Sequence, residues 1–206
     1  GPVLPDRQSE RLNAVSSIHR PESGAGLVVL DRDGVINRES ADFIKSADEW
    51  LPLPGSLEAI AALSRAGFTV VVATNQSGVG RGLISSSALE ELHRRRVQRV
   101  GQAGGRLAGI LSCPHRPEDD CSCRKPKPGL LRQIEARFGC SLKGRPVIGD
   151  SARDLQAAEA VGARAILVRT GNGIGTEQQI RSGSDVEVFD DLAAAASALI
   201  GSGVSG

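Results

Sequence analysis

The sequence predicts an α/β fold in which a Rossmann-like parallel sheet is sandwiched by helices. Short apolar segments rich in β-branched residues alternate with helical patterns from about residue 27 to residue 200. The apolar segments are nearly continuous, which is typical of strands buried on both faces of a parallel sheet. The chain has 206 residues, 40% of them hydrophobic and 24% charged, and these values fit one globular domain.

Six segments are expected to form strands: 27–30, 69–74, 107–113, 146–150, 165–170 and, with a weaker pattern, 186–189. Helices are expected between them over 55–66, 85–102, 128–138, 152–161 and 190–200. Ser85 to Ser87 are placed to cap the second of these helices. The alternation predicts right-handed βαβ units, whose ligands bind beyond the carboxyl ends of the strands.

The two ends of the chain are expected to lie outside the folded domain. Gly1-Pro2 is typical of the residues left by a cleaved expression tag, and the polar segment 1–26 is expected to form a flexible arm. Residues 201–206 are expected to form a flexible tail. A single domain over 27–200 remains.

Composition disfavours several classes of function. The 25 Lys and Arg nearly balance the 24 Asp and Glu, for a formal charge of +1, which argues against a protein that coats a polyanion. Aromatic residues make up only 2%, too few for stacking unpaired bases. No apolar segment approaches the roughly 20 residues of a membrane span, and no secretory signal is evident. We therefore expect a cytoplasmic monomer without nucleic-acid or membrane partners.

Three carboxylates stand at the ends of predicted strands. Asp31 and Asp33 follow the first strand in LDRDGVIN, and Asp150 ends the fourth in VIGD. Because side chains alternate along a strand, positions 31 and 33 face the same way. Aspartate and glycine are also common in turns, so the first pair alone leaves a plain turn open. Together the three carboxylates predict a site for Mg²⁺, which prefers oxygen ligands.

Polar and cationic residues accompany these carboxylates. The segment after the second strand contributes Thr74, Asn75, Gln76 and Ser77. Hydroxyls, amides and backbone N–H groups in such a glycine-rich loop can cradle a phosphate, although the loop alone is equally a simple connection. Arg124 and Lys125 in CRKPKPG would neutralise phosphate oxygens, the arginine through a bidentate fork.

Three of the four cysteines gather with a histidine in the segment 113–123, CPHRPEDDCSC: Cys113, His115, Cys121 and Cys123. Thiolates and an imidazole in two close pairs fit tetrahedral Zn²⁺, and four protein ligands leave no position for water. We therefore expect a structural zinc, with reduced unpaired thiols as the alternative. Cys140 stands apart and is expected to be an ordinary small apolar residue.

Four segments together resemble the motifs of the haloacid dehalogenase superfamily of phosphatases. They are DRDGVIN, ATNQSG, CRKPKPG and VIGDSARDL, and the resemblance spans about residues 27–170. It implies that Asp31 attacks the phosphorus as nucleophile, giving an aspartyl-phosphate. It also implies that Asp33 is the general acid and base. Mg²⁺ would be held by Asp31, the main-chain carbonyl of Asp33, and Asp150.

The same resemblance assigns residues around the phosphate. Thr74 and Lys125 would bind the transferring phosphoryl group, where charge stabilisation is most of the catalysis. Asp154 would fix the geometry of the loop or the lysine. The intervals between the motifs are each largely filled by one crossover unit, so no cap domain of typical size fits, and an open, capless site is expected.

A zinc loop joined directly to CRKP is similar to two narrower families, the heptose bisphosphate phosphatases and the histidinol-phosphate phosphatases. TNQSGVGRG, RKPKPG and LVRTGNG favour the heptose enzymes, and the segment 37–60 resembles the bacterial type associated with the β-anomer. This implies removal of the 7-phosphate of a heptose 1,7-bisphosphate, on the way to ADP-heptose for lipopolysaccharide. Arg124 would recognise the substrate, and the loop 74–77 the sugar phosphate.

Two departures from the heptose pattern leave alternatives open. Ser151 follows the metal-binding aspartate where many heptose enzymes have lysine, and the interval from His115 to Cys121 is short, as in the histidinol-phosphate enzymes. Histidinol-phosphate phosphatase is therefore one alternative. A zinc-loop binding module with a vestigial active site is another. The segment 93–99, HRRRVQR, is expected to be a solvated helix face, and His93 and His19 ordinary surface residues.

Overall fold

The fold is given by a computed structural model, which describes residues 26–38 and 50–202. The expected arm before residue 26, His19, and residues 39–49 of the segment similar to the β-anomer enzymes lie outside the described residues. The same holds for 203–206 of the expected tail.

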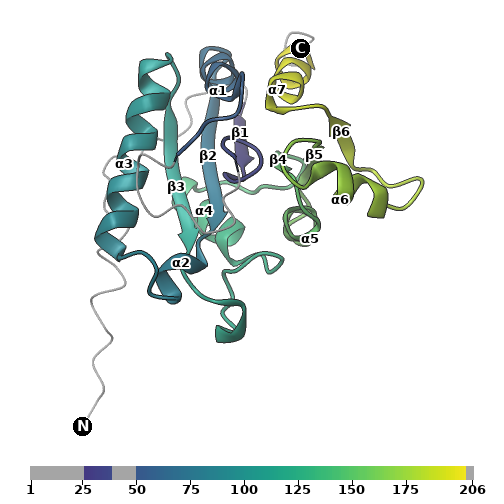
Figure 1. Ribbon diagram of the computed structural model, residues 1–206. Helices are drawn as coiled ribbons and strands as arrows, with labels where there is room; N and C mark the ends of the chain where they lie inside the picture. Colours follow the sequence, from purple (N-terminus) through teal and green to yellow (C-terminus); the bar gives the residue numbers. More distant parts are fainter. Residues whose placement is uncertain (1–25, 39–49, 203–206) are drawn as a thin grey trace.

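A sheet of six parallel strands forms the centre of the domain (Figure 1). Its order is β3-β2-β1-β4-β5-β6. The strands are β1 Gly26–Leu30, β2 Phe68–Asn75, β3 Leu107–Cys113, β4 Pro146–Gly149, β5 Arg164–Val168 and β6 Glu187–Phe189. All six expected strands are confirmed. The strands β2 and β3 lie on one side of β1, and β4, β5 and β6 lie on the other side. This change of side places a topological switch point between β1 and β4, at the carboxyl end of β1.

Seven α-helices lie in the described parts of the chain: α1 Ser56–Arg65, α2 Ser77–Gly80, α3 Ser86–Gln102, α4 Gly129–Phe138, α5 Ala152–Ala160, α6 Gly173–Gln179 and α7 Leu192–Ser202. A 3₁₀ helix, η3, spans Pro117–Asp119. Five of these helices match the expected ranges to within two residues. Of the three serines expected as caps, Ser85 caps α3, accepting a hydrogen bond from Ala88 N at 3.1 Å. Within the described residues, no helix has the length and apolarity to cross a membrane.

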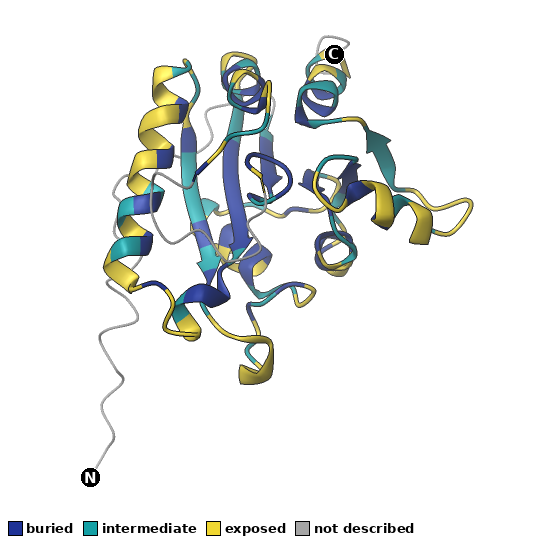
Figure 2. Cartoon of the chain, in the orientation of Figure 1, coloured by how far each residue is buried: buried dark blue, intermediate teal, exposed yellow. Residues whose placement is uncertain are grey.

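Helices cover both faces of the sheet because the strand side chains alternate between two cores. Val28 and Leu30 of β1 face a core shared with α1, α3 and α7, whereas Leu27 and Val29 face a core shared with α4 and α5. The central strands are accordingly buried along their length, and the exposed residues collect on the outer helix faces (Figure 2). This confirms the predicted sandwich.

Two features differ from the expectations. The helices α2 and α6 were not predicted, because they are short and begin in glycine-rich sequence with little apolar periodicity. The helix α7 continues through Gly201 and Ser202, so these two residues belong to the domain and not to a tail. The connection after β2 contains only α2 before α3 begins, and the connection after β3 contains only η3 before α4 begins. Neither of these described connections contains a separate domain.

Candidate active site

A pocket of about 250 Å³ opens at the carboxyl edge of the sheet. The loops after β1, β2, β4 and β5 and the segment before α4 all reach it, as parallel strands require. It is lined by every residue expected at the catalytic site: Asp31, Asp33, Thr74, Asn75, Gln76, Ser77, Arg124, Lys125 and Asp150. Residues from five places in the sequence therefore share one site.

Lys125 lies at the bottom of this pocket and joins two carboxylates. Its buried Nζ donates to Asp31 Oδ1 at 2.8 Å, to Asp154 Oδ1 at 2.7 Å and to the carbonyl oxygen of Ala73 at 2.9 Å. An ammonium has three protons, so all of its donors are used. The lysine therefore fixes Asp31 against the end of β2.

The charges in this group perturb one another. Burial raises the pKa of Asp31 well above its usual value, and the neighbouring Asp154 adds to the effect while Lys125 opposes it. Burial would lower the pKa of Lys125, but the charges of Asp154 and Asp31 raise it. Burial would likewise raise the pKa of Asp154, but Lys125 and the hydrogen bonds from Ser151 hold it below the usual value. The lysine is therefore a permanent cation at the site.

Asp154 is committed to structural contacts. Its Oδ1 accepts from Lys125, and its Oδ2 accepts from Ser151 Oγ at 2.9 Å, Ser151 N at 3.1 Å and Asp150 N at 3.2 Å. These bonds form a capping box at the start of α5. The geometry agrees with the expectation that Asp154 fixes the lysine and the loop.

Asp150 lies beside Asp31 and is held by the loop after β5. Asn172 donates its backbone N–H to Asp150 Oδ2 at 2.9 Å. Gly34 and Gly171 approach so closely that a Cβ on either would lie 2.1 Å or 2.3 Å from the same oxygen, and both have positive φ, 83° and 56°. Only glycine permits this approach. One carboxylate oxygen from each of Asp31, Asp150 and Asp154 lies within 4.8 Å of the others.

This donor set fits Mg²⁺, a hard cation that takes oxygen ligands and is bound through a few carboxylates. Because both oxygens of Asp154 already accept hydrogen bonds, Asp31 and Asp150 are the carboxylates best placed to hold the ion. The carboxylate of Asp33 is not part of this group, and the role expected of its main-chain carbonyl stays a prediction.

Asp33 points its carboxylate to a different set of donors. Arg32 donates from Nε to Asp33 Oδ1 at 2.9 Å and from Nη2 to Oδ2 at 2.7 Å. Asn37 donates from Nδ2 to Oδ1 at 2.8 Å. The two aspartates of LDRDGVIN therefore have separate cationic partners, Lys125 for Asp31 and Arg32 for Asp33.

The loop after β2 holds the site together as well as lining it. Asn75 accepts from Lys125 N at 3.0 Å and donates to the carbonyl oxygen of Lys125 at 3.1 Å, so both ends of its amide bind the lysine backbone. Gln76 Nε2 donates to Thr74 Oγ1 at 2.9 Å. Ser77 is buried at the start of α2. Among the four, Asn75 thus acts mainly on Lys125.

The pocket also contains residues that the sequence did not single out as binding residues: Arg32, Arg81, Arg153 and Asn172. Arg153 lies in the first turn of α5, only three residues after Asp150. This closeness in sequence to a predicted site residue could have identified Arg153 as a binding residue. Arg81 ends α2, a helix that was not expected. Burial lowers the pKa of Arg124, and the nearby charges of Arg153 and Arg81 add to this shift. Three guanidinium groups therefore stand close together at one pocket.

The four residues expected to bind zinc come together beside the pocket. His115 Nδ1 lies 3.4 Å from Cys113 Sγ and 3.3 Å from Cys123 Sγ, and Cys121 Sγ lies 3.5 Å from Cys113 Sγ. All four cysteines are in the described chain, and none of them forms a disulfide. Burial would raise the pKa of Cys121, but the N–H of Arg124 and the neighbouring thiols lower it to about 7. The cluster is compatible with one metal ion.

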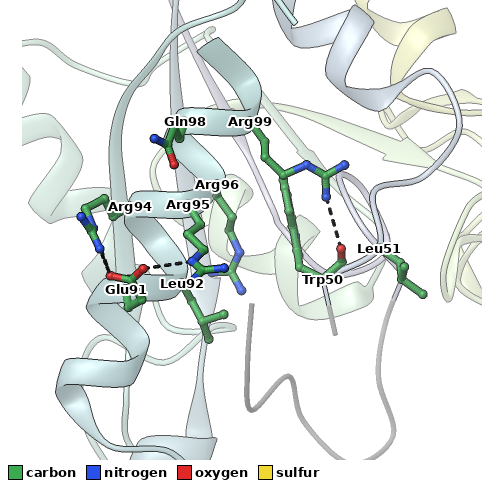
Figure 3. A pocket seen from close by; sticks show the side chains of 9 residues that line it. All are labelled: Trp50, Leu51, Glu91, Leu92, Arg94, Arg95, Arg96, Gln98 and Arg99. Atoms are coloured by element: carbon green, nitrogen blue, oxygen red, sulfur yellow. Dashed lines mark hydrogen bonds and ion pairs between the residues drawn. The ribbon is translucent and has the colours of Figure 1, made fainter. Parts of the chain in front are cut away.

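A second pocket, of about 610 Å³, lies between α3 and Trp50 (Figure 3). Most of 93–99 is exposed, as expected of a solvated helix face, but Arg96 is an exception, because it is buried, and burial lowers its pKa to about 9. Burial also lowers the pKa of His93 to about 3, so this histidine is not an ordinary surface residue. The helix packs Arg96 toward Trp50, with its guanidinium 5.8 Å from the ring centre, while Arg94 and Arg95 remain exposed.

Comparison with known proteins adds independent evidence. A family model described as HAD-hydrolase-like matches residues 122–195. The chain is 53% identical over 175 residues to D-glycero-beta-D-manno-heptose-1,7-bisphosphate 7-phosphatase of Pseudomonas aeruginosa, covering 84% of this chain and 97% of the relative. It is 49% identical over 174 residues to the protein of the same name from Bordetella bronchiseptica, covering 84% and 97%.

The fold agrees with these relatives. The crystal structure of D,D-heptose 1,7-bisphosphate phosphatase from B. bronchiseptica, complexed with magnesium and phosphate, matches with a TM-score of 0.83 and 48% identity, over 86% of this chain and 99% of that one. Sequence identity of about 50% therefore extends over nearly the whole length of these relatives, and the fold is shared as well. The chain therefore belongs to the D-glycero-beta-D-manno-heptose-1,7-bisphosphate 7-phosphatase family of HAD-like hydrolases.

Proposed function

We propose that this protein hydrolyses the 7-phosphate of D-glycero-β-D-manno-heptose 1,7-bisphosphate, a step toward ADP-heptose for lipopolysaccharide. The observation that carries the proposal is one pocket that combines the Asp31–Lys125 pair with three guanidinium groups. Anionic oxygens of a phosphate need such cations, and a bisphosphate needs them at two places. The names of the relatives supply the sugar.

In the proposed reaction, a carboxylate oxygen of Asp31 forms a bond to phosphorus as the bond to the sugar oxygen breaks. Asp33 gives a proton to the departing alkoxide and then takes one from the water that hydrolyses the aspartyl-phosphate, which regenerates both residues. Thr74 and Lys125 hold the oxygens of the transferring group, for which the lysine exchanges the hydrogen bond that it donates to Asp31. Mg²⁺, bound by Asp31, Asp150 and the main-chain carbonyl of Asp33, would offset the repulsion between the carboxylate and the phosphate.

The second phosphate of the substrate is assigned to the guanidinium groups of Arg81, Arg124 and Arg153. Ser151 cannot replace the lysine found in many heptose enzymes, since its hydroxyl is bound to Asp154 as the cap of α5. Arg153 provides a positive charge two residues further on and lines the same pocket. Because neighbouring cations repel one another, an anion between them lowers the cost of bringing them together.

A comparison of kcat/KM for heptose 1,7-bisphosphate and histidinol phosphate tests the proposed function. We expect a clear preference for the bisphosphate, because the guanidinium groups of Arg81, Arg124 and Arg153 would bind its second phosphate. A strong preference for histidinol phosphate would replace the proposal with that alternative. If neither substrate released phosphate, the remaining alternative would be a zinc-loop binding module with a vestigial active site.

Arg153→Ala is expected to raise KM for the bisphosphate roughly tenfold or more, since hydrogen bonds to charged groups contribute about 1.5–3 kcal/mol. KM for the corresponding 7-monophosphate should change much less. Arg132→Ala is the matched control, because Arg132 is exposed and pairs with Glu135 outside the pocket. Equal changes in KM for the two substrates would remove Arg153 from the second-phosphate site. The measurement is a pair of steady-state titrations for each variant.

We also propose that Cys113, His115, Cys121 and Cys123 hold one structural Zn²⁺. The support is that all four ligand atoms lie within 4.8 Å of one another. The metal would matter for catalysis indirectly, because Cys123 directly precedes Arg124 and Lys125. Fixing the loop would then fix the two cations at the site.

Metal analysis should find about one Zn²⁺ per chain in protein purified without added zinc, as expected for a four-ligand site. With Mg²⁺ supplied in every activity assay, removal of the zinc by a chelator should lower both the melting temperature and the activity, and added Zn²⁺, but not further Mg²⁺, should restore both. The variant Cys140→Ser is the control for zinc content, which should stay unchanged, since Cys140 lies outside the cluster. Purified protein with no zinc and a crosslink between two of the cluster cysteines would refute the proposal.

A further inference from the structure

Arg32 is an unusual residue to find between the two aspartates of the pocket, since its side chain is only 2% exposed. Buried arginine requires a partner, because removing a charge from water is costly. Here Nε and Nη2 bind the two oxygens of Asp33, at 2.9 Å and 2.7 Å. The guanidinium fork and the carboxylate therefore face each other in a bidentate pair, which fixes the plane of the carboxylate as well as its position.

Asn37 holds the same carboxylate from a second direction. It is fully buried, and its Nδ2 donates to Asp33 Oδ1 at 2.8 Å and to the carbonyl oxygen of Arg38 at 2.9 Å. The backbone between these residues is closed on itself, because the Arg32 carbonyl accepts from Ile36 N at 2.8 Å and Gly34 N donates to the Asn37 carbonyl at 2.8 Å. Both donors are therefore anchored in one tight loop after β1.

From this geometry we infer that Arg32, assisted by Asn37, is a positioning residue that holds the Asp33 carboxylate at the place where the leaving group departs. The inference rests on the proposed function, in which Asp33 is the general acid and base. A general acid must stay within hydrogen-bond reach of the atom it protonates. Asp33 is part of the pocket lining, and its side chain, 27% exposed, keeps contact with the space that a substrate would fill.

The separate partners of the two aspartates support this role. Lys125 binds Asp31, and both hydrogen bonds from Arg32 go to Asp33, so each carboxylate has its own cation. With separate partners, Asp33 keeps its orientation while Asp31 forms its bond to phosphorus.

Arg32→Lys tests the inference, because lysine keeps the charge and loses the fork. The measurement is the release of the leaving group in the first turnover, from phenyl phosphate and from 2,4-dinitrophenyl phosphate. Phenolate is a basic leaving group that needs a proton, whereas 2,4-dinitrophenolate departs without one. We expect the first rate to fall on the order of 10-fold to 100-fold, since a misplaced acid loses part of the roughly 10²-fold to 10⁴-fold that general acid catalysis contributes. The second rate should stay nearly unchanged.

Two further variants keep the test decisive if Arg32→Lys folds poorly. Asn37→Ser should show the same selective loss to a smaller extent, since it removes one donor from Asp33 Oδ1. Arg164→Lys is the matched control: it makes the same change in another arginine that binds a carboxylate through its fork, that of Glu187, outside the pocket lining. It should leave the ratio of the two rates unaltered.

Asp33→Asn separates failure of the inference from failure of the proposed function. If Asp33→Asn slows only the phenyl ester while Arg32→Lys slows both esters equally or neither, the positioning role is wrong and the acid role stands. If Asp33→Asn slows both esters equally, the acid role is wrong, and the inference falls with it. A selective loss in both variants supports both.

Discussion

Replacing Asp31 with asparagine is expected to abolish turnover, with a loss of roughly 10⁴-fold or more, as found when a nucleophile is removed from a catalytic group. An amide lacks the carboxylate oxygen that bonds to phosphorus, so no aspartyl-phosphate forms. The fold should remain intact, because asparagine has nearly the same shape. Lys125 also keeps its bonds to Asp154 and to the carbonyl of Ala73. Phosphate release and the melting temperature measure the two halves of this prediction.

Asp120→Asn is the control for this substitution. It makes the same chemical change at an exposed aspartate, which pairs with Lys127 away from the pocket lining. We expect its activity to equal that of the parent protein. If instead the Asp31→Asn protein released phosphate at the parent rate with Mg²⁺ present, Asp31 would not be the nucleophile.

Lys125→Met should lower the free energy of unfolding as well as the activity. Lys125 Nζ joins two carboxylates, and without it Asp31 and Asp154 would face each other with no cation between them. Breaking a buried ion pair by removing one partner costs about 3–5 kcal/mol. Activity should fall at the same time, since the lysine also binds the transferring phosphoryl group in the proposed reaction. Urea unfolding, followed together with phosphate release, measures both effects.

Lys127→Met is the matched control, two positions along the chain. Lys127 is half exposed and pairs with the exposed Asp120, and pairs of this kind contribute about 1 kcal/mol or less. Its variant should therefore unfold close to the parent midpoint. A Lys125→Met protein as stable as the parent would show that the two carboxylates do not depend on the lysine, contrary to the ion-pair network seen here.

The strands and the long helices could be predicted because their signals are local. The apolar segments 27–30 and 69–74 are too continuous to be half-exposed, and only a buried parallel sheet uses such strands. The meeting of Asp31 and Asp150 also followed, since β1 and β4 are parallel neighbours whose carboxyl ends lie at the same edge. The short helices α2 and α6 escaped prediction, because tertiary packing stabilises them more than their own sequence does.

Other features depended on contacts between residues far apart in the chain. Asn75 was expected to face the ligand, yet its amide binds the backbone of Lys125, 50 positions later. Arg96 was expected to be solvated, yet α3 turns it inward beside Trp50. Pattern analysis assigns a residue to a helix or a loop, but only the packing of elements decides which neighbours its side chain meets.

The sequence by itself determined the fold class, the strand-end carboxylates and the clustering of three cysteines with a histidine, because each depends on periodicity or on short spacing. Tertiary structure alone decided which cation serves which carboxylate. Lys125 reaches Asp31 across the sheet, whereas Arg32 folds back on Asp33 next to it in the chain. The reason is that charge pairing depends on distance in space, and distance along the chain does not measure it.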